Sequence, residues 1–270
     1  MLADKVWYQD GATVVAAVAL GVSLVSSLIS MWHTEVKDKQ DAHLDLRTVL
    51  QRLLALPKES IDLRDKYKGS SDLDTINLAL NLEMTFLASQ GALLARKLGE
   101  KLVTVPEYLT LARAQCDVFN YTAQSEFIEH ALNLANTAND LIAALRDAAT
   151  FQFARGNYDA GRAKLSQALA TFETYKGYDP GTVAVTKAQI RYNWAQLEGA
   201  IGNFEGAQQQ LTEAMDMLAQ APVTPYGDML KQQIQVFWNA PPTTAAAVTN
   251  PVQVAGAPIA AQASVPVAAP

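Results

Sequence analysis

The chain has 270 residues, and 50% of them are hydrophobic, so it can bury a core as one domain with extensions or as two small domains. Its 27 Asp and Glu residues outnumber its 21 Lys and Arg residues. The resulting net charge of −6 argues against a nucleic-acid-binding protein, because such proteins usually carry a basic face. One Cys and three His exclude an intramolecular disulfide and leave few ligands for a metal cluster.

An uncharged run near the N-terminus predicts a transmembrane helix. Residues 11–32 carry no charge, and as a helix they span about 33 Å, enough for a hydrocarbon core of about 30 Å. Trp7, Tyr8 and Trp32 flank the run as interfacial aromatic residues do. The alternatives are a cleaved signal peptide and a buried helix of a soluble protein. A signal peptide has a basic start and a shorter apolar stretch, so we expect a retained helix after a short extracytoplasmic head of residues 1–10.

Basic residues near the ends of this run indicate its orientation. The N-terminal side offers only Lys5 and the α-amino group, whereas four basic residues follow the run within about 20 positions. These four are Lys37, Lys39, Arg47 and Arg52. We therefore expect the N-terminus outside and the C-terminal domain in the cytoplasm, at the inner (plasma) membrane. This arrangement resembles that of small bacterial single-pass proteins.

Small residues recur along the run at alternating steps of four and three, which places them on one helix face. Such a face lets helices approach closely in lipid and favours a homo-oligomer or docking to another membrane helix. The alternative is that Ala and Ser are simply common in these helices. The six residues of the face are Ala12, Ala16, Ala19, Ser23, Ser26 and Ser30.

The body of the chain shows helical periodicity and no alternating strand pattern, so the predicted fold class is all-α. A helix is expected over 35–56, ended by Pro57, and a charged connector follows it, so that residues 33–72 form a juxtamembrane helix and connector. A long amphipathic helix is expected over 74–99. Its apolar stripe is formed by Ile76, Leu80, Met84, Leu87, Leu94 and Leu98.

Two cap signatures predict where later helices begin. Thr104-Val105-Pro106-Glu107 is a capping box with Pro in the first turn. In Asp179-Pro180, the aspartate accepts from orphan backbone N–H groups at the helix start.

The C-terminal segment has a different composition. No charged residue follows Lys231, and residues 239–270 consist largely of Ala, Val, Thr and Gln interrupted by Pro. Frequent Pro prevents a stable helix, and little large apolar surface is present to offset the entropy of ordering. We expect a disordered tail that serves as a spacer, as a docking strand or as a segment without specific contacts.

Two segments of the body repeat one another. Gly156-Asn157-Tyr158-Asp159 and Gly202-Asn203-Phe204-Glu205 are each followed by small and apolar residues at helical spacing. A Gly permits the left-handed residue that ends one helix, and an aromatic residue then packs in the corner before the next helix. Tyr121 begins a fainter relative that lacks the Gly.

This pattern resembles the tetratricopeptide repeat (TPR), a pair of antiparallel helices that stacks into a solenoid. The resemblance covers roughly residues 105–220 and is clear in two repeat units. The steps between aromatic residues, 37 and 46, exceed the usual 34, Gly161 stands where the family prefers Ala, and Arg191 replaces the usual Trp of the first helix. A chance helical hairpin is the alternative. The resemblance implies a TPR-like solenoid or bundle over residues 73–238.

By this resemblance, the function is binding of a partner protein on a concave surface lined by the first helix of each pair. Arg can grip a carboxylate and aromatic rings supply rigid contact area, although each residue could equally be an ordinary helix residue. The positions transferred from the family are Arg146, Thr150, Phe153, Gln189, Tyr192 and Gln196.

A search for chemistry finds no phosphate-binding glycine motif, nucleophile elbow or kinase set, so we expect no enzyme and no cofactor. Glu126 and His130 lie one turn apart but lack a second ligand pair, so we expect no metal. His43 is expected to be solvated, and Cys116 to be a buried inert thiol.

The sequence thus predicts a membrane-anchored scaffold that binds a protein, with no nucleic-acid partner. Tethering raises the effective concentration of such a binder at the membrane. Two alternatives stay open. The body could lie on the envelope side of the membrane with the tail as a spacer, or it could be a helical regulator or enzyme with an unrecognised site.

Overall fold

The computed structural model describes residues 11–70, 72–100 and 102–239, and within the first helix it describes side chains from Val36 onward. In this described part the secondary structure is entirely α-helical, as the sequence predicts, with nine helices and no strand. In chain order the helices are α1 (Gly11–Lys66), α2 (Leu73–Leu98), α3 (Val105–Asp117), α4 (Tyr121–Leu134), α5 (Ala138–Ala154), α6 (Tyr158–Thr174), α7 (Pro180–Ala200), α8 (Phe204–Gln220) and α9 (Pro225–Asn239).

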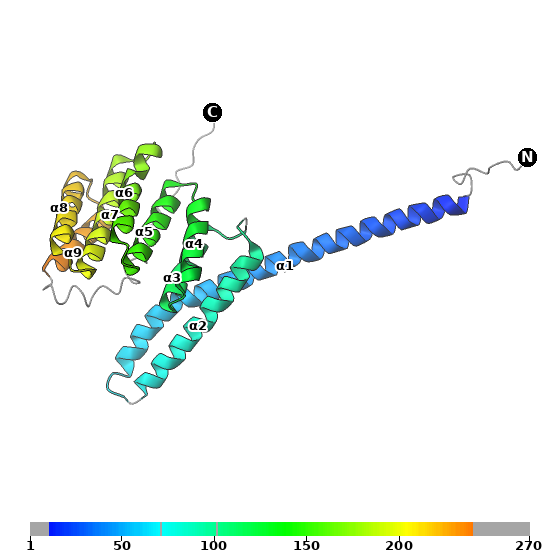
Figure 1. The fold of residues 1–270 in the computed structure, drawn as a ribbon, viewed down its shortest axis with the longest axis horizontal. Coiled ribbons are helices and arrows are strands. Elements are labelled where there is room, and N and C mark those ends of the chain that lie inside the picture. The colour runs from blue at the N-terminus through cyan, green and yellow to red at the C-terminus, as the bar shows by residue number, and fades with distance from the viewer. Residues whose placement is uncertain (1–10, 71, 101, 240–270) are drawn as a thin grey trace, which may run out of the picture.

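The helices form successive antiparallel pairs, α1 with α2, α3 with α4, α5 with α6 and α7 with α8, and α9 packs at the end against α7 and α8. Figure 1 shows the pairs from α3 onward standing side by side, while the N-terminal part of α1 extends as a long arm beyond the other helices. Three groups of buried side chains join the pairs. The first lies among α1 to α5 around Leu46 and Leu111, the second around Ile142 and Ile190, and the third around Leu218 and Leu230.

The expected end of the first helix at Pro57 is wrong, because α1 continues through this proline to Lys66. Proline removes a backbone donor and its ring opposes the carbonyl one turn earlier. α2 packs along α1 and sustains the helix past the proline. Arg52 also bridges the proline turn, since it donates to Glu59 (2.6 Å) and to both carboxylate oxygens of Glu83 on α2 (2.6 and 3.1 Å). The first part of the segment predicted as a charged connector, residues 58–66, therefore forms the last turns of α1.

The helix expected over 74–99 is confirmed as α2, and its predicted stripe from Ile76 to Leu98 is its half-buried or buried side. The helix that begins in the predicted capping box is confirmed as α3. The Glu107 carboxylate accepts from the backbone N–H of Thr104 (2.8 Å) and from its hydroxyl (2.9 Å). The other predicted cap also forms, since the Asp179 carboxylate accepts from the backbone N–H of Thr182 (2.9 Å).

The same turn closes three of the helical pairs. Asn120, Asn157 and Asn203 each donate their backbone N–H to the carbonyl five residues earlier, at 2.8, 2.9 and 2.9 Å. In each case the preceding residue has a positive φ, 59° at Phe119, 77° at Gly156 and 81° at Gly202. These are the bonds of a Schellman ending, in which a left-handed residue closes one helix before the next begins.

Gly161 has a packing reason to replace the Ala of the resembled family. A methyl group at this position would collide with the ring of Phe153 across the contact between α5 and α6. The two helices therefore approach more closely here than Ala would allow.

Candidate functional site

Four helices form one layer of the molecule. α3 contacts α5, α5 contacts α7, and α7 contacts α9, whereas α4, α6 and α8 are the second members of their pairs. We call α3, α5, α7 and α9 the inner layer. It contains most of the buried polar side chains and is therefore the candidate site.

Arg146 of α5 is the least satisfied group in this layer. Its side chain is 94% buried, since its exposed fraction is 6%. Among the described residues, its Nε and Nη2 atoms have no hydrogen-bond partner. Burial lowers the pKa of this guanidinium, and the charge of Asp147 opposes that effect in part. A buried donor without an acceptor costs about 1–3 kcal/mol, and more when it is charged, so this arrangement calls for an additional acceptor.

The adjacent Asp147 does not accept a hydrogen bond from Arg146, because its carboxylate pairs with Arg113 of α3. Arg113 donates from Nε and Nη2 to the two carboxylate oxygens at 2.9 and 3.1 Å. This bidentate pair satisfies the buried carboxylate and ties α3 to α5. Sequence reasoning missed both residues. Their separation of 34 positions, about one TPR length, is the signal that could have found them.

A chain of amides crosses the layer from α9 to α7. The Tyr226 hydroxyl donates to Gln189 Oε1 (2.7 Å), Gln189 Nε2 donates to Asn193 Oδ1 (3.4 Å), and Asn193 Nδ2 donates to Gln196 Oε1 (3.2 Å). Burial raises the pKa of Tyr226, and the charge of Arg146 opposes that effect in part. Carbonyl, hydroxyl and guanidinium groups can together recognise a carboxylate or a peptide backbone.

The structure divides the predicted partner-binding residues into two groups. Phe153 lies in the core between α5 and α6, and Tyr192 packs edge-to-face on Phe237 of α9 with ring centroids 6.1 Å apart. Both rings therefore pack against other residues of this chain. Gln189 is also buried, under Tyr226. Thr150 and Gln196 stay half-exposed beside Arg146 and the amide chain, respectively. The prediction overlooked α9, which covers part of α7.

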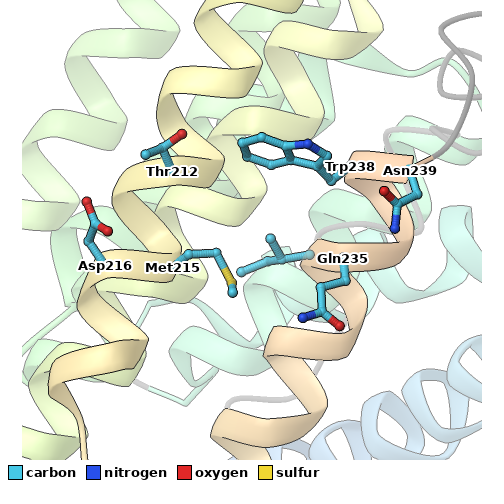
Figure 2. Close-up of a pocket in the computed structure, with 7 residues that line it drawn as sticks. Thr212, Met215, Asp216, Gln235, Trp238 and Asn239 are labelled. Atoms are coloured by element: carbon cyan, nitrogen blue, oxygen red, sulfur yellow. The ribbon is translucent and has the colours of Figure 1, made fainter.

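A shallow pocket of about 330 Å³ lies between α8 and α9. Figure 2 shows Met215 of α8 and Trp238 of α9 at its wall, with Asp216 and Gln235 also among the residues that line it. Its lining is mixed and it contains one carboxylate, so it offers no set of convergent polar groups.

The residues considered as metal ligands have protein partners instead. His130 pairs with Glu100 (2.9 Å) and stacks on Tyr108, while Glu126 is held by Arg96 at 2.6 and 2.9 Å. In the described residues, no group of three or more His, Cys, Asp and Glu could hold a metal ion. His43, which was expected to be solvated, contacts Glu107 at 3.3 Å. Cys116 is half-buried, and burial followed by the charge of Asp117 raises its pKa, away from a reactive thiolate.

One helix in the described part, α2, is long and apolar enough to cross a membrane. The predicted transmembrane run of residues 11–32 belongs to α1, but its side chains lie outside the described residues. The small-residue face from Ala12 to Ser30 lies outside them for the same reason. Comparisons of the chain with protein-family profiles, curated proteins and solved structures give no significant match.

Proposed function

We propose that this protein is a membrane-anchored scaffold whose TPR-like inner layer binds an acidic group of a partner protein. The observation that carries the proposal is the buried guanidinium of Arg146, which has two donors without acceptors in the layer of first helices. A partner carboxylate would supply those acceptors, and guanidinium–carboxylate pairs are bidentate and strong. Arg113 is not the receptor for this group, because Asp147 already engages it.

The repeated turns support the TPR-like part of the proposal. Three helical pairs close with the same Schellman bonds and continue through an Asn and an aromatic residue into the next helix. Repetition of one supersecondary unit is the basis of solenoid proteins, whose extended inner surfaces bind other chains.

The anchor is proposed to be the run 11–32, and α2 is proposed to be part of the folded domain. The backbone carbonyl of Ala88 on α2 accepts from Gln115 Nε2 of α3 (2.7 Å), and Arg52 of α1 holds Glu83 of α2. These contacts tie α2 to two neighbouring helices. A helix surrounded by lipid would lack such contacts. The run 11–32 lies in the arm that extends beyond these pairs (Figure 1).

Site-specific photo-crosslinking of the full chain in cells tests the binding surface. A photoreactive residue at Thr150 or Gln196, on the inner layer, is expected to capture the same partner. One at Gln167, exposed on α6, is not. Arg146→Gln is expected to abolish capture, whereas the matched control Arg155→Gln, at the exposed end of the same helix, is expected to retain it.

Stability of the same variants separates binding from folding. Because Arg146 lacks acceptors, Arg146→Met is expected to keep or raise the thermal stability of the unbound protein while it abolishes capture. Equal crosslinking at Gln167, or loss of capture in Arg155→Gln, would overturn the proposed surface.

The anchor is tested separately. The full chain is expected to resist carbonate extraction from membranes, and a variant lacking residues 11–32 is expected to be released. A C-terminal reporter active only in the cytoplasm is expected to give a signal. Activity of an external reporter instead would favour the envelope-side scaffold.

A further inference from the structure

The outer side of α2 carries an apolar stripe that no described helix covers. Its four large side chains lie on one face at steps of four, four and seven residues, which is helical spacing. Their exposed fractions are 60% for Leu78, 61% for Leu82, 66% for Phe86 and 67% for Leu93. This exposed stripe lies on the opposite side of α2 from the apolar stripe predicted from the sequence, Ile76 to Leu98, so α2 is apolar on two sides.

This stripe does not stabilise the chain itself. The other sides of α2 already pack on α1 and α3, where Gly91 lies against Val49 and Leu111. Exposed apolar side chains in contiguous array mark an interaction surface.

The membrane proposed above does not reach the stripe. Gly91 of α2 lies level with Val49 of α1, and α1 is one continuous helix. Seventeen residues separate Val49 from residue 32, the end of the proposed anchor, which is a distance of about 25 Å along the helix. The middle of the stripe, at Leu82 and Phe86, lies further away still, because α2 is antiparallel to α1.

The stripe is complementary to itself when two copies of α2 run antiparallel. Such a pair can place Leu78 of one copy beside Leu93 of the other and Leu82 beside Ser89, with both Phe86 rings near the two-fold axis. Every exposed residue of α2 between Thr75 and Leu93 is uncharged. Glu83, in the middle of α2, is held by Arg52 of α1, and the other charges lie at the two ends. Asp72 and Asp74 lie at the start, and Lys97 lies at the finish beside Arg96, which pairs with Glu126 of α4.

These end charges select the orientation. In an antiparallel pair the acidic start of each helix lies beside the basic end of the other, and the helix dipoles oppose one another favourably. In a parallel pair like charges meet at both ends. The four side chains can bury on the order of 500 Å² per copy, so with their neighbours the pair reaches the lower range of specific interfaces.

We propose that a second copy of this chain covers the stripe, and that two α2 helices pair antiparallel around Phe86. This goes beyond the proposed scaffold function and rests on it only for the anchor at residues 11–32, which places the membrane away from the stripe. In this dimer the two α1 helices point in opposite directions.

Cysteine crosslinking of the full chain in mild detergent tests the pairing. In a Cys116→Ala background, Leu78→Cys and Leu93→Cys chains are mixed and treated with a short bismaleimide. A heterologous 78–93 crosslink is expected, with little product from either variant alone. In a parallel pair these two positions would lie about 22 Å apart, and 78–78 and 93–93 products would dominate instead.

Matched surface variants test the stripe by sedimentation. Phe86→Asp is expected to weaken the dimer at least tenfold, whereas Leu54→Asp, at a 64% exposed leucine of α1, is expected to leave it unchanged. Circular dichroism checks that both variants are folded. The proposal is overturned by a monomer at all concentrations, by dominant 78–78 and 93–93 products, or by equal weakening in Leu54→Asp.

Discussion

Phe119 occupies a backbone position that favours glycine, so Phe119→Gly is expected to stabilise the protein. Its φ of 59° matches those of Gly156 and Gly202 at the corresponding turns. A left-handed backbone costs a residue with a Cβ about 1 kcal/mol, which glycine does not pay. The Phe119 side chain is 76% exposed, so its removal loses little burial. We expect a gain of about 0.5–1 kcal/mol.

The reciprocal variants are expected to have the opposite effect. A methyl group at Gly156 or Gly202 meets no atom within 4 Å, so Gly156→Ala and Gly202→Ala add backbone strain alone. Each is expected to cost about 1 kcal/mol. For a domain of this size, 1 kcal/mol corresponds to a change in Tm of about 2–4 °C, which thermal unfolding followed by circular dichroism resolves.

Phe119→Ala is the control for the ring. It keeps the strain and removes the edge-to-face contact with Tyr121, whose centroid lies 6.4 Å away. No gain in Tm is expected from it. A lower Tm in Phe119→Gly than in wild type would refute the reasoning, because the ring would then contribute more than the backbone strain costs.

Three further predictions concern titration, a buried ion pair and the proline of α1. Burial raises the pKa of Asp117 to about 6, so the folded state binds a proton that the unfolded state releases above about pH 4. Asp117→Asn is therefore expected to raise the free energy of unfolding at pH 8 by about 1–2 kcal/mol, seen as a higher Tm. This gain is expected to vanish towards pH 4, and a gain independent of pH would contradict the prediction. Glu198 is 2% exposed and accepts from Arg162 at 2.7 and 2.8 Å. Arg162→Ala is therefore expected to lower the free energy of unfolding, measured in urea, by about 2–3 kcal/mol. Removal of the Asp159 carboxylate, which is exposed and pairs with the same arginine, is expected to cost little. Pro57→Ala restores a backbone donor inside α1, so it is expected to raise the stability by about 1–3 kcal/mol and hence the Tm; an unchanged or lower Tm would contradict this.

The starts of the second helices were predictable because they are local signals. Asn followed by an aromatic residue precedes α4, α6 and α8, at Tyr121, Tyr158 and Phe204. The weakest of the three units lacked its glycine, yet it folds in the same way because Phe119 accepts the left-handed conformation. The turn hydrogen bonds, rather than the glycine, define the unit.

The features that sequence reasoning missed depend on contacts between distant segments. Pro57 ends a helix by local rules, but packing against α2 and the bridge of Arg52 sustain α1. Tyr192 is buried because α9 packs on it. Arg146 lacks an acceptor from the neighbouring carboxylate because Asp147 accepts from Arg113. The exposed stripe of α2 was visible as apolar residues on both sides of the helix, but one amphipathic face was enough to explain the helix itself.

The continuity of α1 fixes the rotation of the α1–α2 hairpin relative to the N-terminal part of the helix. Because one helix runs from Gly11 to Lys66 without a break, a twist applied at its N-terminal part turns the α1–α2 hairpin by the same angle. Each residue inserted into the stretch between the proposed anchor and the hairpin rotates everything beyond it by about 100° and moves it by about 1.5 Å. A flexible linker would absorb such a change, whereas in this continuous helix the length of one segment sets the direction that the inner layer faces.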